Sequence, residues 1–144
     1  MKVEKLGDLD LRYTSLEMID LPPGGQIYGT MEGRLDGPRL SGSLHLTNLA
    51  ARRADNVNLP TLRGVLRTDD GAAVWVELDG ISTLRPTDGA RVFVTTFRCR
   101  SGDERYAWVN TFFGVVEGVL LGVVVGAHAT GEIHECQATA GMSA

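Results

Sequence analysis

The sequence predicts an all-β protein, a single antiparallel β-barrel that spans residues 1–144. Short runs in which apolar and polar residues alternate recur along the chain, and turn residues separate them about every ten positions. The 18 glycines and the lack of a long amphipathic helical pattern also favour strands, because Gly weakens a helix interior by about 1 kcal/mol relative to Ala. We expect a closed barrel, since closure removes exposed sheet edges.

The first strand is predicted from Leu9, Leu11 and Tyr13, which alternate with polar residues. The pattern continues to Met18 with a change of phase, as a β-bulge would produce. Prolines and glycines over residues 20–25 then end the strand. Further alternating runs cover residues 26–35, 39–49, 62–68, 72–79 and 91–100. Residues 50–58 are polar and predict the longest surface loop.

The best-specified pair of strands is a hairpin over residues 62–79. A three-residue turn with Gly71 in the left-handed conformation gives a register that pairs apolar residues with one another and Arg63 with Glu77. The predicted pairs are Leu66 with Val74, Gly64 with Val76, Leu62 with Leu78, Val65 with Trp75, and Arg63 with Glu77.

A short helical turn is predicted near residues 103–109, and an apolar stretch follows it. From residue 109 to residue 131 Glu117 is the only formal charge. Glycines recur every four residues at Gly114, Gly118, Gly122 and Gly126, which on a helix is the packing pattern of a membrane span. The valines between them favour a strand over residues 112–126 instead. The glycine row then marks a close approach by a neighbouring strand, a partner subunit or a ligand.

Three segments carry a resemblance to a known family: GRLDGPRLSG at residues 33–42, LRTDDGA at residues 66–72 and GDERYAWVN at residues 102–110. In order and spacing they resemble the family called domain of unknown function 3237. The resemblance implies one antiparallel barrel, similar in outline to calycins and to allene oxide cyclase-like barrels. It also implies an interior that holds a small apolar molecule, and it brings no settled reaction.

An acid–base pocket is one predicted site. A carboxylate beside a cation and aromatic walls can promote cyclisation or isomerisation without a cofactor, so we assign catalysis to Glu77 and Arg98. The ligand-binding candidates are Trp75, Tyr106, Trp108 and Asn110. The structural alternatives are that Glu77 pairs with Arg63, and that the two aromatic residues at positions 106 and 108 close one end of the barrel.

A metal site is a second hypothesis. Period-two alternation places Glu132 and His134 on one face of the closing strand, and His45 on another strand is the third candidate ligand. The alternative is a polar outer face. We otherwise expect no cofactor.

The partner expected is a hydrophobic small molecule, such as a secondary metabolite. The chain would be a binding barrel or a cofactor-independent cyclase or isomerase. The alternative is a non-catalytic carrier or structural barrel that forms a homodimer through its apolar strands. The net charge of −4 argues against nucleic acid. The N-terminal residues lack the apolar core of a signal peptide, so we expect a cytoplasmic protein in which Cys99 and Cys136 are reduced thiols.

Overall fold

The structure, a computed structural model, describes residues 1–141, so the last three residues of the predicted domain lie outside the described part. It is an all-β fold with one short 3-10 helix, as predicted. The elements are β1 (Lys2–Leu21), β2 (Gly24–Asp36), β3 (Gly42–Asn48), β4 (Ala51–Arg52), β5 (Asn58–Leu59), β6 (Thr61–Thr68), β7 (Ala73–Leu84), β8 (Arg91–Arg100), η1 (Glu104–Thr111), β9 (Gly114–Leu120) and β10 (His128–Gln137).

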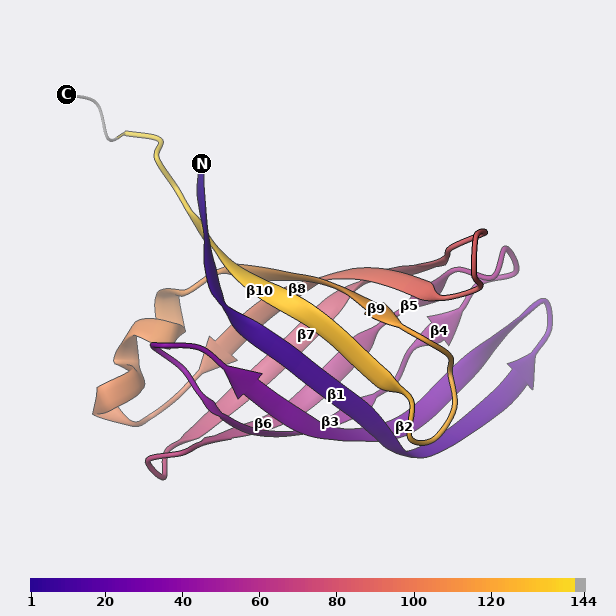
Figure 1. The fold of residues 1–144 in the computed structure, drawn as a ribbon, viewed down its shortest axis with the longest axis horizontal. Helices are drawn as coiled ribbons and strands as arrows, with labels where there is room; N and C mark the ends of the chain where they lie inside the picture. The colour runs from indigo at the N-terminus through magenta and orange to yellow at the C-terminus, as the bar shows by residue number, and fades with distance from the viewer. Residues whose placement is uncertain (142–144) are drawn as a thin grey trace.

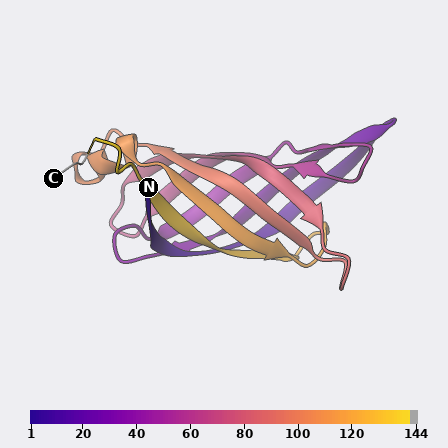
Figure 2. The same cartoon turned by 90° about the horizontal axis from the view of Figure 1, so that it is seen from above.

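Eight antiparallel strands close into a barrel, in the order β1, β10, β9, β8, β7, β6, β3 and β2, with β2 pairing back to β1 (Figure 1). The short strands β4 and β5 bridge β2 and β7 at one end. The tip of the β1–β2 hairpin extends beyond the barrel at that same end (Figure 2). Residues 51–59 therefore contain two strands, which corrects the prediction of a plain surface loop; both are too short to show alternation.

Alternation along the strands separates the core from the surface. Leu9, Leu11 and Tyr13 of β1 are buried, and the residues between them are exposed. The phase change in β1 is a β-bulge between Tyr13 and Ser15, as predicted. The register of the β6–β7 hairpin is also confirmed in full, and Gly71 in its turn has φ +95°. Both features follow from local chemistry, since turn type and cross-strand pairs set the register.

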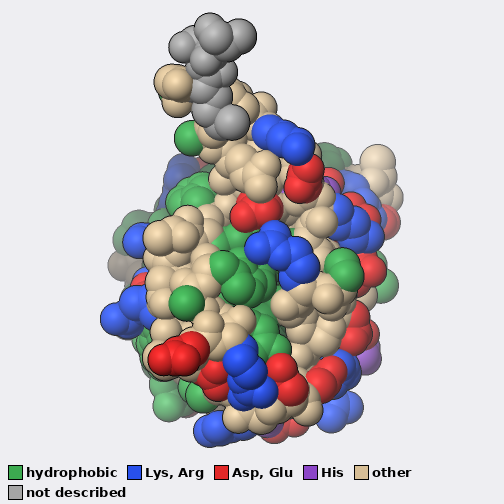
Figure 3. Space-filling view, turned by 90° about the vertical axis from the view of Figure 1, so that its left-hand side faces the viewer, with side chains coloured by type: hydrophobic (Ala, Val, Ile, Leu, Met, Phe, Trp, Pro, Cys, Tyr) green, Lys and Arg blue, Asp and Glu red, His purple; other side chains and the backbone are tan. Residues whose placement is uncertain are grey.

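The helix η1 closes one end of the barrel. Its Val109 is buried, and Phe112 directly after it packs edge-on against Phe97 of β8 and against Trp108. Asp103 caps the helix by accepting a hydrogen bond from the Arg105 backbone N–H at 2.9 Å. Apolar side chains fill the centre of this end, with charged side chains around them (Figure 3). The predicted helical turn is confirmed.

The apolar stretch forms a shorter strand than predicted. β9 ends at Leu120, and residues 121–127 form a loop at the opposite end of the barrel from η1. Gly122 and Gly126 have φ of 140° and 87°, so the chain leaves the extended conformation there, and the Gly126 N–H donates to the carbonyl of Tyr13 at 2.9 Å. In residues 1–141 no helix has the length and apolar character needed to cross a membrane.

The glycines of β9 make room for aromatic rings and for a neighbouring strand. A Cβ at Gly118 would meet the Thr130 carbonyl oxygen of β10 and lie 2.6 Å from Cζ of Phe93. A Cβ at Gly114 would lie 2.5 Å from Cε1 of Phe112. The sequence left open whether a neighbouring strand, a partner subunit or a ligand approaches the glycine row. Gly118 accommodates the neighbouring strand β10 and the ring of Phe93, and Gly114 accommodates the ring of Phe112.

Candidate functional site

The predicted catalytic pair lies outside the barrel. Glu77 and Arg98 are directly opposite each other on β7 and β8, but both side chains point away from the interior. The inward positions of β7 belong to Val74, Val76 and Leu78, all fully buried. Because side chains alternate along a strand, Glu77 must then face outward with Trp75. An interior acid–base pocket built on Glu77 and Arg98 is therefore not formed.

Glu77 instead belongs to a surface network. Its carboxylate lies 3.3 Å from Nε of Arg63, and the indole N–H of Trp75 donates to it at 3.2 Å. Arg63 also pairs with Asp79 at 2.9 Å. Glu77, Arg98 and Asn110 border one outer hollow, of about 130 Å³. The ion pair with Arg63 was the structural alternative for Glu77, and the structure favours it.

The other ligand-binding candidates hold η1 against its end of the barrel. The Tyr106 hydroxyl donates to the Asp70 carboxylate at 2.9 Å, and the guanidinium of Arg39 lies 4.1 Å from the ring centre of Trp108. Asn110 exchanges two hydrogen bonds with the backbone of Ser101, at 2.9 and 3.0 Å. These contacts give the side chains a structural role. For Tyr106 and Trp108 this agrees with the alternative that they close one end of the barrel.

The candidate metal ligands do not meet. His45 on β3 lies 3.8 Å from Glu32 of β2, whereas His134 lies 4.0 Å from Glu132 on the same strand, β10. In the sheet, β1 and β2 lie between the strands of the two histidines. Across residues 1–141 no group of three or more His, Cys, Asp and Glu side chains is placed to hold a metal ion. The three-ligand metal site is therefore wrong, because its residues lie on the outer faces of strands that are not neighbours.

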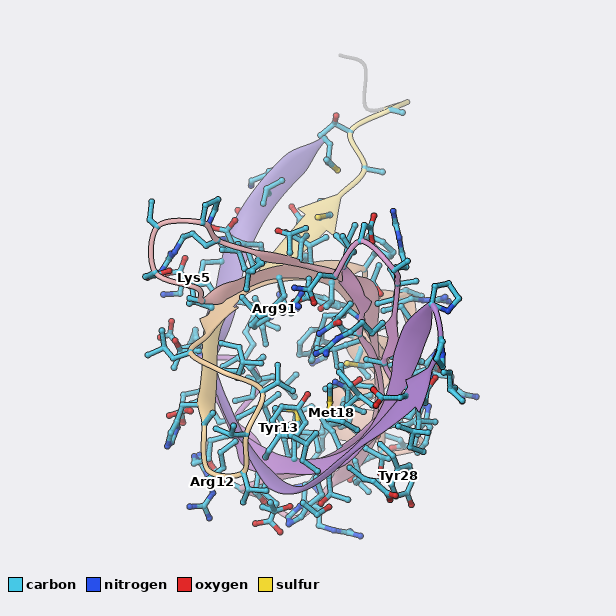
Figure 4. All side chains as sticks on the ribbon, turned by 90° about the vertical axis from the view of Figure 1, so that its right-hand side faces the viewer. Lys5, Arg12, Tyr13, Met18, Tyr28 and Arg91 are labelled. Carbon is cyan, nitrogen blue, oxygen red and sulfur yellow. The ribbon has the colours of Figure 1, made fainter. Side chains whose placement is uncertain are left out.

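The interior of the barrel holds a cavity of about 60 Å³ at the end opposite η1. Figure 4 looks into this end and shows Tyr13 and Arg91 projecting inward, while Lys5, Arg12 and Tyr28 lie outside (Figure 4). The lining is mostly apolar. It consists of Leu9, Leu11, Tyr13, Ile27, Met31, Asn48, Ala50, Asn58, Pro60, Leu62, Leu78, Ser82, Phe93, Thr95, Leu120, Val123 and Ala129.

A chain of polar groups lines one side of this cavity. The Asn48 amide donates to the Tyr13 hydroxyl at 2.9 Å and accepts a hydrogen bond from the backbone N–H of Thr61 at 3.2 Å. Tyr13 and Asn48 are both buried. Burial raises the pKa of Tyr13, and the hydrogen bond from Asn48 opposes that shift. The Tyr13 hydroxyl accepts from Asn48, so its own proton is left to donate into the cavity.

A second polar group in the cavity has no partner. Thr95 is 2% exposed, and its hydroxyl is the one buried side-chain polar atom among residues 1–141 without a hydrogen bond. An unsatisfied buried hydroxyl costs about 1–3 kcal/mol. Proteins usually pair such groups, so an unpaired one that lines a cavity is typical of a position that a ligand or ordered water completes.

Arg91 lies next to the cavity, beside the lining residues Ser82 and Leu120. It is the first residue of β8 and shares the inward face of that strand with Phe93 and Thr95. Its guanidinium donates to the carbonyl of Asn56 at 2.7 Å, to the carbonyl of Ser82 at 3.2 Å and to the side chain of Asn56 at 2.9 Å. Burial lowers the pKa of Arg91, and the nearby charge of Arg52 lowers it further.

Sequence reasoning missed this set because it chose residues for their chemistry before the inward face was known. The available signal was the alternation itself. Tyr13 shares a face with Leu9 and Leu11, and Thr95 shares a face with Phe93 and Phe97. Polar residues in phase with a buried apolar row are the ones that a barrel places inside.

Comparison with known proteins supports the fold. No protein-family model matches the chain, and no curated protein matches it. A beta-barrel like protein from Acinetobacter baumannii superposes with a TM-score of 0.80, at 14% identity over 94% of this chain and 96% of that one. A conserved protein of unknown function from Rhodopseudomonas palustris gives 0.77, at 18% identity over 93% and 96%.

A third similar structure is described as an enzyme from Penicillium herquei. Its TM-score is 0.64 at 19% identity, over 92% of this chain and 93% of that one. At such identities the likeness shows a shared barrel fold alone.

Proposed function

We propose that this protein binds a small hydrophobic molecule inside the barrel, at the end opposite η1. The observation that carries the proposal is the unpaired Thr95 hydroxyl in an otherwise apolar cavity. Mostly apolar walls with a few well-placed polar groups are typical of small-molecule sites. Tyr13 supplies a second donor on the wall. We also propose membership of the domain of unknown function 3237 family, on its three sequence segments, and that family implies the same kind of interior.

Binding is favoured over catalysis by what the lining contains. Among the described residues that line the cavity, Tyr13 alone has an ionisable side chain, and no carboxylate or imidazole is present. A cyclase or isomerase acting on a hydrophobic metabolite would use Tyr13 as its proton donor, with Asn48 positioning the hydroxyl. The raised pKa of Tyr13 makes its hydroxyl a weaker acid, which works against that role and further favours binding.

Titration with toluene, followed by the backbone amide signals in NMR, tests the binding proposal. We expect saturable shifts at Phe93, Thr95 and Leu120, which line the cavity, and none at Glu77 or Arg98 on the outer surface. Shifts confined to the outer surface, or none that saturate, would contradict the proposal.

Two alanine-to-leucine variants, one inside the cavity and one on the surface, provide the control. Ala129→Leu adds volume to the buried lining, whereas Ala51→Leu adds the same atoms at an exposed position. The first is expected to abolish the toluene shifts and the second to leave them unchanged.

Self-association is the second candidate function, and the loop over residues 121–127 favours it. Val123 points into the cavity, but Leu121 is 75% exposed and Val124 and Val125 are also largely exposed. Exposed apolar side chains grouped on one loop are typical of an interaction surface. If the protein self-associates in this way, the end of the barrel that holds the cavity would face a second copy of the chain.

A further inference from the structure

Arg91 is a buried cation without a counter-ion. It is 4% exposed, and no carboxylate of residues 1–141 lies within 4.0 Å of its guanidinium. Arg side chains are almost never fully buried unless paired, because removing a charge from water is costly. The other arginines without a carboxylate partner, apart from Arg52, are exposed to solvent; they are Arg12, Arg67, Arg98 and Arg100.

The hydrogen bonds of Arg91 leave part of the guanidinium free. The group has five N–H donors, and three hydrogen bonds are made, two from Nη1 and one from Nη2. The N–H on Nε and one N–H on Nη2 therefore lack a partner among the described residues. Two neighbouring N–H groups on one edge of a guanidinium match the two oxygens of a carboxylate.

A second cation stands at the same rim. Arg52 of β4 is half-buried, and its Nε donates to the Asn58 side chain at 3.1 Å. Asn58 lines the cavity, so this contact places Arg52 beside its mouth. Like Arg91, Arg52 forms no ion pair within residues 1–141. Because neither arginine forms an ion pair with a residue of the described chain, their charges make this part of the rim positive, although the net charge of the chain is −4.

The strand geometry places an apolar cavity directly below this positive rim. Phe93 and Thr95 follow Arg91 on the inward face of β8, and at about 3.3 Å per residue they lie about 7 Å and 13 Å farther along the strand. A molecule that enters at Arg91 would meet the Phe93 ring next and the unpaired Thr95 hydroxyl below it.

We propose that the ligand is an amphipathic carboxylate, whose carboxylate binds Arg91 and Arg52 at the mouth and whose apolar part fills the cavity. This inference rests on the proposed binding function and names its ligand class. The competing explanation is that Arg91 only ties down the loop over residues 53–57 through Asn56, whose φ of 66° turns its carbonyl and side chain toward the guanidinium. That structural role predicts no preference for an anion.

Hexanoate and hexanamide distinguish the two explanations, because they share a chain and differ in charge. Each is titrated into the wild-type protein at neutral pH, and the amide signals of Phe93, Thr95 and Leu120 report on binding. Hexanoate is expected to bind about tenfold more tightly than hexanamide. The affinity of hexanoate alone should fall as ionic strength rises from about 0.02 M to about 0.3 M.

Three variants test which arginine causes the preference for hexanoate over hexanamide. Arg91→Gln is expected to remove the preference for hexanoate, and Arg52→Gln to reduce it several-fold. Arg98 lies on the outer face of β8, the strand of Arg91, so Arg98→Gln should leave the preference unchanged. If Arg91→Gln does not fold, the Arg52→Gln variant and the salt dependence still decide the question.

The outcomes separate the two proposals. Equal binding of hexanoate and hexanamide, or toluene binding without hexanoate binding, would overturn the carboxylate inference and leave the binding function intact. Failure of toluene, hexanoate and hexanamide alike to shift the cavity signals would overturn both.

Discussion

The buried Thr95 hydroxyl is expected to lower the free energy of unfolding, because it has no hydrogen-bond partner among the described residues. Replacing it with a methyl group removes an unsatisfied polar group and keeps the side-chain shape. We expect Thr95→Val to raise the free energy of unfolding by about 1 kcal/mol, measured by chemical denaturation.

The adjacent Thr96 provides the matched control for Thr95. Its hydroxyl bonds to both the backbone N–H and the carbonyl of Asp79, each at 3.2 Å. Thr96→Val should therefore lower the free energy of unfolding by about 0.5–1.5 kcal/mol. If Thr95→Val lowers stability as well, the Thr95 hydroxyl has a partner such as a bound water, and it is not a vacant ligand contact.

The two cysteines are expected to differ in reactivity because they differ in burial. Burial raises the pKa of Cys99 to about 12, so at neutral pH its thiol is neutral and inaccessible. Cys136 on β10 is half-buried, and both thiols are free. In the native protein iodoacetamide is expected to modify Cys136 first, as followed by mass spectrometry, while Cys99 reacts only after unfolding. Equal labelling rates would show that the Cys99 end of the barrel opens.

At the scale of elements, β9 depends on glycine where it passes Phe93. An Ala at position 118 would place a methyl group against the Thr130 carbonyl and 2.6 Å from the Phe93 ring. Overpacking of this kind costs about 1–3 kcal/mol, so we expect Gly118→Ala to lower the free energy of unfolding by that amount.

Gly102 is the control for Gly118. A Cβ there would meet nothing within 4 Å, so Gly102→Ala should leave the stability near that of the wild type. Because Phe93 also lines the cavity, Gly118→Ala is expected to weaken toluene binding in the NMR titration. Unchanged stability of Gly118→Ala would mean that β9 and β10 separate at little cost.

At the scale of the whole molecule, the barrel has two unlike ends. The helix η1, with Val109 and Phe112, packs into one end, and the other combines the cavity with arginines and exposed apolar side chains. Ligand entry and self-association would compete for this second end. A ligand that shields the mouth should then weaken any dimer.

Sedimentation velocity over a range of protein concentrations tests the self-association candidate. It predicts a concentration-dependent dimer that Leu121→Asp converts to monomer, because a charge would have to be buried in the interface. Val3→Asp, at an exposed position toward the η1 end, should have no effect. A monomer at every concentration would rule out this function for the wild-type protein.

The amino-acid sequence alone predicts the all-β class, the β6–β7 register, the bulge in β1 and the helical turn near residue 103. Each of these rests on interactions between residues close in the chain, such as turn chemistry at Gly71 and capping by Asp103. Alternation also divided each strand into two faces, but it did not say which face a closed sheet would turn inward.

The location of the candidate site could not be predicted from the sequence, because it depends on contacts between residues distant in the chain. Closure of the barrel turned Glu77 and Arg98 outward and brought Arg91 to Asn56 and Tyr13 to Asn48, pairs that are 35 positions apart in the chain. An arginine at the start of a strand is ordinarily solvated, so the phase that Arg91 shares with Phe93 and Phe97 did not by itself predict its burial. Its position at the mouth of a cavity arises because strands distant in the chain enclose it.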